Sequence, residues 1–275
     1  MVRLSVMLAA SALVAAAPAA DRMTPDEAAA VQRALDRGAL LYAYDQAAWH
    51  GTDDFLAKAP DTIRRSGGWI VDGPADAPTL VFFDKDDPPK TIYVARFSGG
   101  KLVQAHLPSA TEDRTLSPLR LRMVAALRSA RAAFGHAPGV FACANKPFNT
   151  VVLPPERPDG PILVYFLTPQ TRAGEYPLGG HYLIEVDASG AVGVPRAFTK
   201  SCLPIAPDAT KGRPSAMLVS HLLDPTPTEI HVFSSLVARL PVYVATQGGK
   251  RLWSVAGSTI RLVDAKPKAA TPPAS

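Results

Sequence analysis

Short apolar runs with a period of two recur along this chain, and turns rich in glycine, proline and aspartate separate them. Such alternation is typical of strands that bury one face. Two turns, Ser98-Gly99-Gly100 and Asp187-Ala188-Ser189-Gly190, have the glycines of tight hairpins. Because hairpins join antiparallel neighbours, the pattern predicts largely antiparallel, twisted sheets. The predicted strands are 69–72, 79–84, 91–97, 101–106, 150–153, 162–167, 181–186, 191–198, 241–246, 252–255 and 259–263.

Segments with helical periodicity lie between these groups of strands. Thr24-Pro25-Asp26-Glu27 has the form of a capping box and predicts a helix over about 25–48, weakened at Gly38. Thr52 is the expected N-cap of a second helix over about 53–65. Ser117-Pro118 predicts the start of a third, which ends at Gly135. Helices packed on largely antiparallel sheets define an α+β fold.

The two halves of the chain repeat one plan, in which a helix precedes four strands joined by similar turns. This repetition indicates two similar α+β units, by duplication or by chance. We predict an N-terminal unit over 21–110 and a C-terminal unit over 117–264. Residues 265–275 are mainly proline, alanine and lysine, and we expect this tail to be disordered.

The first twenty residues are typical of a signal peptide. Arg3 supplies the positive charge, residues 4–14 form an apolar stretch too short to span a bilayer, and Ala17-Pro18-Ala19 resembles a cleavage signal. No later apolar run is long enough for a membrane helix. We therefore expect residues 1–20 to be removed and the protein to be soluble and periplasmic or secreted. Removal of Arg3 with this segment lowers the net charge from +5 to +4, which is ordinary for this length and does not indicate a nucleic-acid partner.

Cys143 and Cys202 are the two cysteines of the chain. Neither stands in a recognised nucleophile motif, and an even number of cysteines in an exported protein favours a disulfide. We predict that these two residues are bonded to each other.

The stretch from Leu218 to Leu240 has the most sharply specified chemistry. Thr226-Pro227-Thr228-Glu229 has the form of a second capping box, with Thr226 as the expected N-cap. His221, Asp224, Glu229 and His231 lie within eleven residues of one another. Phe233 is expected to anchor the apolar face of the helix, with His231 at the edge of that face.

The segment DPTPTEIHVF resembles the corresponding segment of JAMM (JAB/MPN) metal-dependent hydrolases, and the resemblance covers the C-terminal half of the chain. That family uses a His-x-His pair, then a serine, and an aspartate three residues after the serine. Thr228 stands at the serine position and His231 at the aspartate position, while Leu218 and Ser220 stand at the histidine positions. The resemblance implies a related fold whose metal ligands are not preserved.

The same stretch offers a different metal site, because His221, Asp224 and His231 carry the nitrogen and oxygen ligands that zinc binds. The alternative is a structural role, in which His231 is partly buried and Asp224 bonds amides of the turn. A second pair, His181 and Glu185, lies four residues apart on a predicted strand. Their side chains are expected on one solvent-exposed face, as an ion pair or as a general acid–base pair.

The sequence has no G-x-S-x-G, P-loop, dinucleotide or C-x-x-C motif. We therefore expect a non-catalytic binding or structural protein of the cell envelope, without a cofactor, whose partner is an envelope protein or a small molecule. The alternative is a zinc-dependent hydrolase of the peptidase or isopeptidase type with an altered site.

Overall fold

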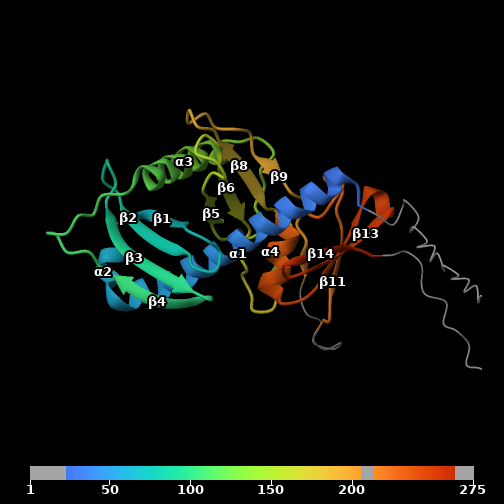
Figure 1. Cartoon of the computed structure of the whole chain (residues 1–275), viewed down its shortest axis with the longest axis horizontal. Helices are drawn as coiled ribbons and strands as arrows, with labels where there is room; N and C mark the ends of the chain where they lie inside the picture. The colour runs from blue at the N-terminus through green and yellow to red at the C-terminus, as the bar shows by residue number, and fades with distance from the viewer. Residues whose placement is uncertain (1–22, 206–213, 264–275) are drawn as a thin grey trace, which may run out of the picture.

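The computed structural model describes residues 23–205 and 214–263. The expected signal peptide and the expected disordered tail lie outside these residues. Within them the fold is α+β, as predicted, and consists of three four-stranded sheets and four α-helices. Figure 1 shows the first sheet at one end of the molecule, the second near the middle and the third at the other end.

Helix α1 (Pro25–Lys58) is the element that joins the three sheets, since it contacts β2, β5 and β14. It begins at the predicted capping box: Thr24 Oγ1 accepts the Glu27 N–H at 3.2 Å, and the Thr24 N–H donates to Glu27 Oε2 at 2.8 Å. The helix is longer than predicted and continues through Gly38. The prediction of a separate helix over about 53–65 with Thr52 as its N-cap is wrong. Thr52 lies inside α1, and its hydroxyl donates to the carbonyl of Ala48.

The first two sheets follow the predicted strands, except that the strand predicted over 191–198 is reduced to the two residues Arg196–Ala197. A one-turn helix, α2 (Pro60–Ile63), leads into the first sheet, and α3 (Pro118–Gly135) connects the two. In the first sheet the order is β1 (Ser66–Asp72), β2 (Thr79–Asp84), β3 (Thr91–Ser98) and β4 (Lys101–His106), all antiparallel. In the second sheet it is β5 (Asn149–Leu153), β6 (Ile162–Leu167), β8 (Tyr182–Val186) and β9 (Arg196–Ala197), also antiparallel.

The third sheet contains the one parallel pair of strands in the described part of the chain. It consists of β11 (Met217–Ser220), β12 (Val242–Thr246), β13 (Arg251–Ala256) and β14 (Thr259–Leu262). Strands β11 and β12 are parallel because α4 (Glu229–Ala238) connects them as a crossover. A short 3-10 turn, η2 (Gln247–Gly249), joins β12 to β13, and a two-stranded ribbon pairs β7 (Tyr176–Pro177) with β10 (Pro204–Ile205).

Helices cover both faces of the first two sheets. In β2, Leu80 and Phe82 face the core on the α1 side, whereas Val81 and Phe83 face the core on the α3 side. Strand β6 is buried along its whole length for the same reason. The two predicted α+β units are separated by a linker in the sequence. In the structure, however, the first and second sheets both contribute residues to the core on the α1 side and to the core on the α3 side. A third core lies between α1, α4 and the third sheet, around Trp253.

The predicted Cys143–Cys202 disulfide is present. It ties the segment that follows α3 to the segment that precedes β10. Because the two cysteines have a sequence separation of 59, the bond restricts the unfolded chain substantially and is expected to stabilise the fold by about 4 kcal/mol.

Candidate functional site

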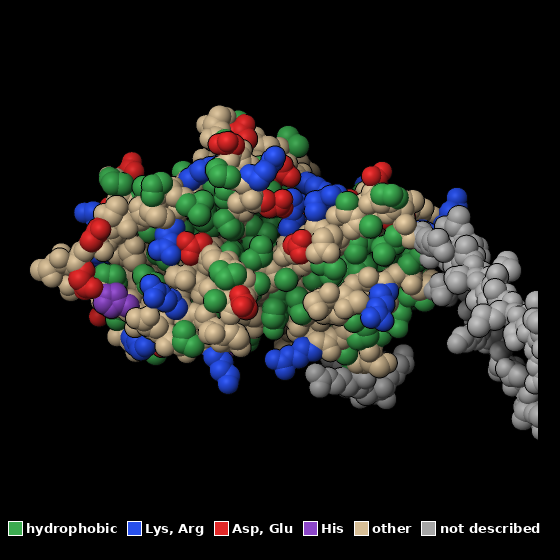
Figure 2. All heavy atoms as spheres, in the orientation of Figure 1, with side chains coloured by type: hydrophobic (Ala, Val, Ile, Leu, Met, Phe, Trp, Pro, Cys, Tyr) green, Lys and Arg blue, Asp and Glu red, His purple; other side chains and the backbone are tan. Residues whose placement is uncertain are grey.

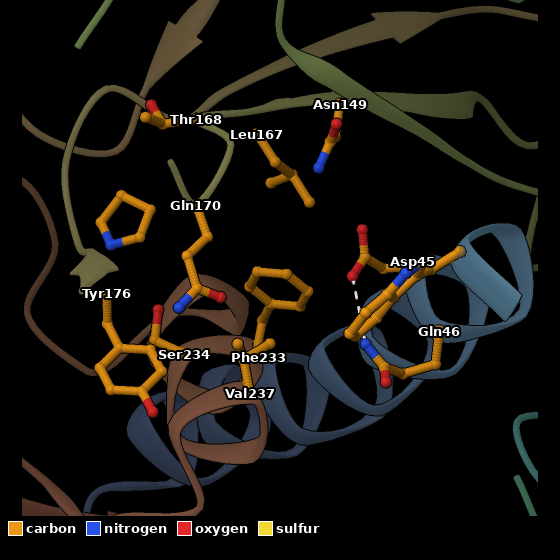
Figure 3. Close-up of a pocket in the computed structure, with 12 residues that line it drawn as sticks. Asp45, Gln46, Asn149, Leu167, Thr168, Gln170, Tyr176, Phe233, Ser234 and Val237 are labelled. Atoms are coloured by element: carbon orange, nitrogen blue, oxygen red, sulfur yellow. Dashed lines mark hydrogen bonds between the residues drawn. The ribbon is translucent and has the colours of Figure 1, made fainter. Parts of the chain in front are cut away.

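A pocket of about 260 Å³ lies between α1, α4 and the loop that follows β6 (Figure 3). Its volume lies just below the range of roughly 300–1,000 Å³ typical of pockets for drug-sized ligands. We call it the Asp45 pocket. It is lined by Asp45, Gln46, Trp49, Asn149, Leu167, Thr168, Gln170, Tyr176, Pro177, Phe233, Ser234 and Val237.

Two helices supply the pocket's central side chains. Asp45 and Trp49 lie one turn apart on α1 and therefore project from the same side of that helix. Phe233, Ser234 and Val237 come from α4. Figure 3 shows the Phe233 ring in the middle of the pocket, with the Asp45 carboxyl group on one side and Tyr176 on the other. Phe233 is therefore half-buried at the pocket, and the prediction that it anchors the core is only partly correct.

Asp45 is the acidic group of this pocket. Its side chain is partly buried, and burial raises the pKa of its carboxyl group to about 6, although a hydrogen bond from Gln46 acts in the opposite direction. That bond, from Gln46 Nε2 to Asp45 Oδ2, is long at 3.4 Å, and it is the only one the carboxylate receives from the described residues. The carboxylate thus retains most of its capacity to accept hydrogen bonds.

Ser234 carries a second unused polar group. The residue is 4% exposed, and its hydroxyl oxygen has no hydrogen-bond partner among the described residues. A buried hydroxyl without a partner costs free energy, and such groups are few in folded proteins. Thr168, by contrast, donates its hydroxyl hydrogen to the carbonyls of Gly179 and Gly180.

Trp49 lies at the rim of the pocket and is 59% exposed. Its indole stacks on the ring of His50, with 5.1 Å between the ring centroids. The sequence analysis did not identify this pocket. Its lining residues are spread between positions 45 and 237, and no local motif marks them. The one available signal was Trp49, a large aromatic residue among polar residues of the predicted first helix.

The predicted His221–Asp224–His231 group lies at the start of α4, and none of its members lines the Asp45 pocket. His221 is buried, and its Nε2 is 2.9 Å from Asp224 Oδ2, while Asp224 Oδ1 accepts from Arg196 at 2.7 Å. Burial alone would raise the pKa of Asp224, but the hydrogen bond from His221 and the charge of Arg196 lower it. The Asp224 carboxylate is therefore engaged on both oxygens.

His231 is buried more deeply than the predicted position at the edge of the apolar face. The N-cap of α4 is Thr228 and not Thr226, and the Thr228 N–H donates to His231 Nδ1 at 3.0 Å. His231 thus takes the place of the glutamate in a capping box. Burial, together with the nearby His221, lowers the pKa of His231 to about 3, so the ring is neutral with its proton on Nε2.

The rings of His221 and His231 are close, with centroids 4.7 Å apart. Over residues 23–205 and 214–263, however, no three His, Cys, Asp or Glu side chains form a group that could hold a metal ion. His221, Asp224 and His231 instead bond to protein groups. The geometry gives the zinc hypothesis no support, and it stays an untested prediction.

His181 and Glu185 do not share an exposed face, so this prediction is wrong. Glu185 is exposed, but His181 is buried, and the Thr168 N–H donates to its Nδ1 at 3.1 Å. Its Nε2 is 3.0 Å from the carbonyl of Pro177 and carries the ring proton. Burial lowers the pKa of His181 to about 4. His181 therefore fixes the backbone of two pocket residues, Thr168 and Pro177.

Glu229, the remaining predicted residue, is buried and accepts a hydrogen bond from the Tyr165 hydroxyl at 2.8 Å. It lines a second, polar groove together with Glu185, Asp224, Arg33, Arg37 and Arg196. Figure 2 shows Lys or Arg beside Asp or Glu side chains over this part of α1. Because opposite charges are mixed in the groove, it does not favour a ligand of either sign.

Comparison with protein-family models, curated proteins and solved structures gave no match. Among the helices of the described segments, none is both long and apolar enough to cross a bilayer.

Proposed function

We propose that this protein is an exported, non-catalytic binding protein that holds a small organic molecule in the Asp45 pocket. One observation carries the proposal. Three aromatic side chains, Trp49, Tyr176 and Phe233, line the same small pocket as two polar groups with unused hydrogen-bonding capacity, Asp45 and Ser234. Apolar walls with a few convergent polar groups are the usual composition of a ligand site.

The lining residues favour binding over catalysis. Ser234 has no base within hydrogen-bond distance, and a serine nucleophile requires one. His181, which lies behind the lining residues Thr168 and Pro177, uses both ring nitrogens for backbone groups. Export is supported by the Cys143–Cys202 bond, because disulfides persist in oxidising compartments such as the periplasm and the extracellular space.

A ligand-observed NMR screen of the purified mature protein tests this proposal. The library should contain compounds small enough for a pocket of about 260 Å³. Val237→Trp places a large side chain in the pocket wall and should abolish binding of the hits. Leu222→Trp is the matched control, because Leu222 is 77% exposed and lies outside the pocket. Hits that bind the Val237→Trp variant as well as the parent would contradict the proposal.

A further inference from the structure

The charge of the Asp45 pocket restricts the ligands that it can accept. Its lining contains one carboxylate, Asp45, and no lysine, arginine or histidine. Its other polar groups are neutral amides, hydroxyls and a phenol. A bound anion would therefore face Asp45 with no cation to offset the repulsion, and a neutral ligand would cover the carboxylate without neutralising it.

The aromatic residues favour the same sign of charge. The face of an aromatic ring attracts a cation within about 6 Å of its centroid, and tryptophan does so most strongly. Trp49 lies one turn from Asp45 on the same helix, and Phe233 lies across the pocket from that carboxyl group (Figure 3). A cation bound at Asp45 would therefore lie close to the aromatic side chains that line the pocket.

We propose that the ligand is a small organic ammonium ion, with its charged group at Asp45 and an apolar body against Phe233 and Val237. This inference rests on the proposed function. The N–H groups of the ammonium donate to the carboxylate oxygens, which receive only the long bond from Gln46 among the described residues.

The raised pKa of Asp45 is consistent with this assignment. An ionised carboxylate that burial has partly desolvated, and that no protein cation neutralises, is unfavourable in the free protein. A cationic ligand removes that cost on binding. Functional groups of this kind lower the stability of the free protein, so their replacement often stabilises the fold.

The test compares three probes of similar size and different charge at pH 7.5: phenethylamine, 2-phenylethanol and 3-phenylpropionate. Isothermal titration calorimetry should show the amine binding roughly tenfold or more tightly than the alcohol, with the carboxylate weakest. Asp45→Asn should remove the preference for the amine and raise the melting temperature of the free protein. Asp53→Asn, which alters an exposed aspartate of α1 outside the pocket, should change neither.

The outcomes separate the two proposals. Equal binding of the amine and the alcohol by the parent, lost in Val237→Trp, would overturn the ammonium assignment and leave the pocket as a ligand site. Preference for the carboxylate, or an unchanged preference for the amine in Asp45→Asn, would overturn the assignment as well. If neither these probes nor any screened compound binds, the proposed function is also wrong.

Discussion

Val232 of α4 lies against Gly38 of α1 so closely that a methyl group on Gly38 would stand 2.5 Å from the Val232 Cβ. This contact sets the distance between the two helices. The Asp45 pocket lies about two turns further along α1, and the buried histidine pair lies at the first turn of α4. Both sites therefore depend on this helix crossing.

Gly38→Ala should destabilise the protein, although alanine favours helices over glycine by about 1 kcal/mol. Forcing the helices apart is expected to cost about 1–3 kcal/mol, which outweighs that gain. Urea unfolding measures the difference. Gly135→Ala in α3 is the control, because a methyl there meets nothing within 4 Å, and it should be neutral or slightly stabilising. Stabilisation by Gly38→Ala would show that the helices do not approach this closely.

His231→Ala should cost about 2 kcal/mol, and not the small amount expected of a residue at a helix edge. The change removes the acceptor of the Thr228 N–H, which is then buried without a partner. His231→Gln should recover much of the loss, because glutamine is a natural residue at this position of a capping box. His136→Ala, at an exposed site, should change the free energy of unfolding by less than about 0.5 kcal/mol. Equal loss in the Gln and Ala variants would contradict the capping role.

Acid should destabilise the protein partly through His231 and His181. Their pKa values in the folded protein, about 3 and about 4, lie below the ordinary value of 6.5. The unfolded chain therefore binds more protons below pH 6.5. Stability is fully present above that pH and falls as the pH drops toward the folded pKa values, by up to about 1.4 kcal/mol per pH unit for each histidine.

His231→Gln should reduce this acid sensitivity. Denaturant unfolding at pH 7.5, 5.5 and 4.5 should give a shallower loss of stability in the variant than in the parent. Exposed His136→Gln is the matched control and should follow the parent. An unchanged slope in His231→Gln would mean that His231 is protonated in the folded protein.

Asp45→Asn should stabilise the free protein at neutral pH by about 1–2 kcal/mol. The folded pKa of about 6 lies above the ordinary value of 3.8, so the folded state binds more protons between these values. Stability from this group is present below pH 3.8 and is lost as the pH rises through 6. The advantage of the variant should therefore vanish near pH 4, which thermal unfolding at pH 4 and pH 7.5 can measure.

Phenethylamine affinity should fall as the pH drops below 6, because protonation neutralises the Asp45 carboxylate. Two histidines also lie near this site: burial lowers the pKa of His181, behind Thr168, to about 4, and His50 stacks on Trp49 at the rim. The Asp45→Asn variant retains both histidines and therefore isolates the effect of Asp45. Calorimetry at pH 7.5 and pH 5 measures the effect, which should be absent in Asp45→Asn. An affinity that is independent of pH in the parent would contradict ionisation of Asp45 in this range.

Features that depend only on neighbouring residues could be predicted from the amino-acid sequence. Strand positions followed from the period of two, and the hairpin at Gly99 and Gly100 followed from the need for positive φ, which both residues adopt. The capping box at Thr24 and the start of α3 after Ser117 are equally local. The Cys143–Cys202 pair followed from the number of cysteines and the expected compartment.

Tertiary structure decided the rest, because distant segments compete with local preferences. Thr226 and Thr228 both satisfy the local pattern of an N-cap, and the buried ring of His231 selects Thr228. Gly38 weakens an isolated helix, but the close approach of Val232 requires it. His181 alternates with apolar neighbours as an exposed residue would, yet it is buried against Thr168 and Pro177. The Asp45 pocket exists only because α1, α4 and the loop after β6 meet there, and no local pattern records that meeting.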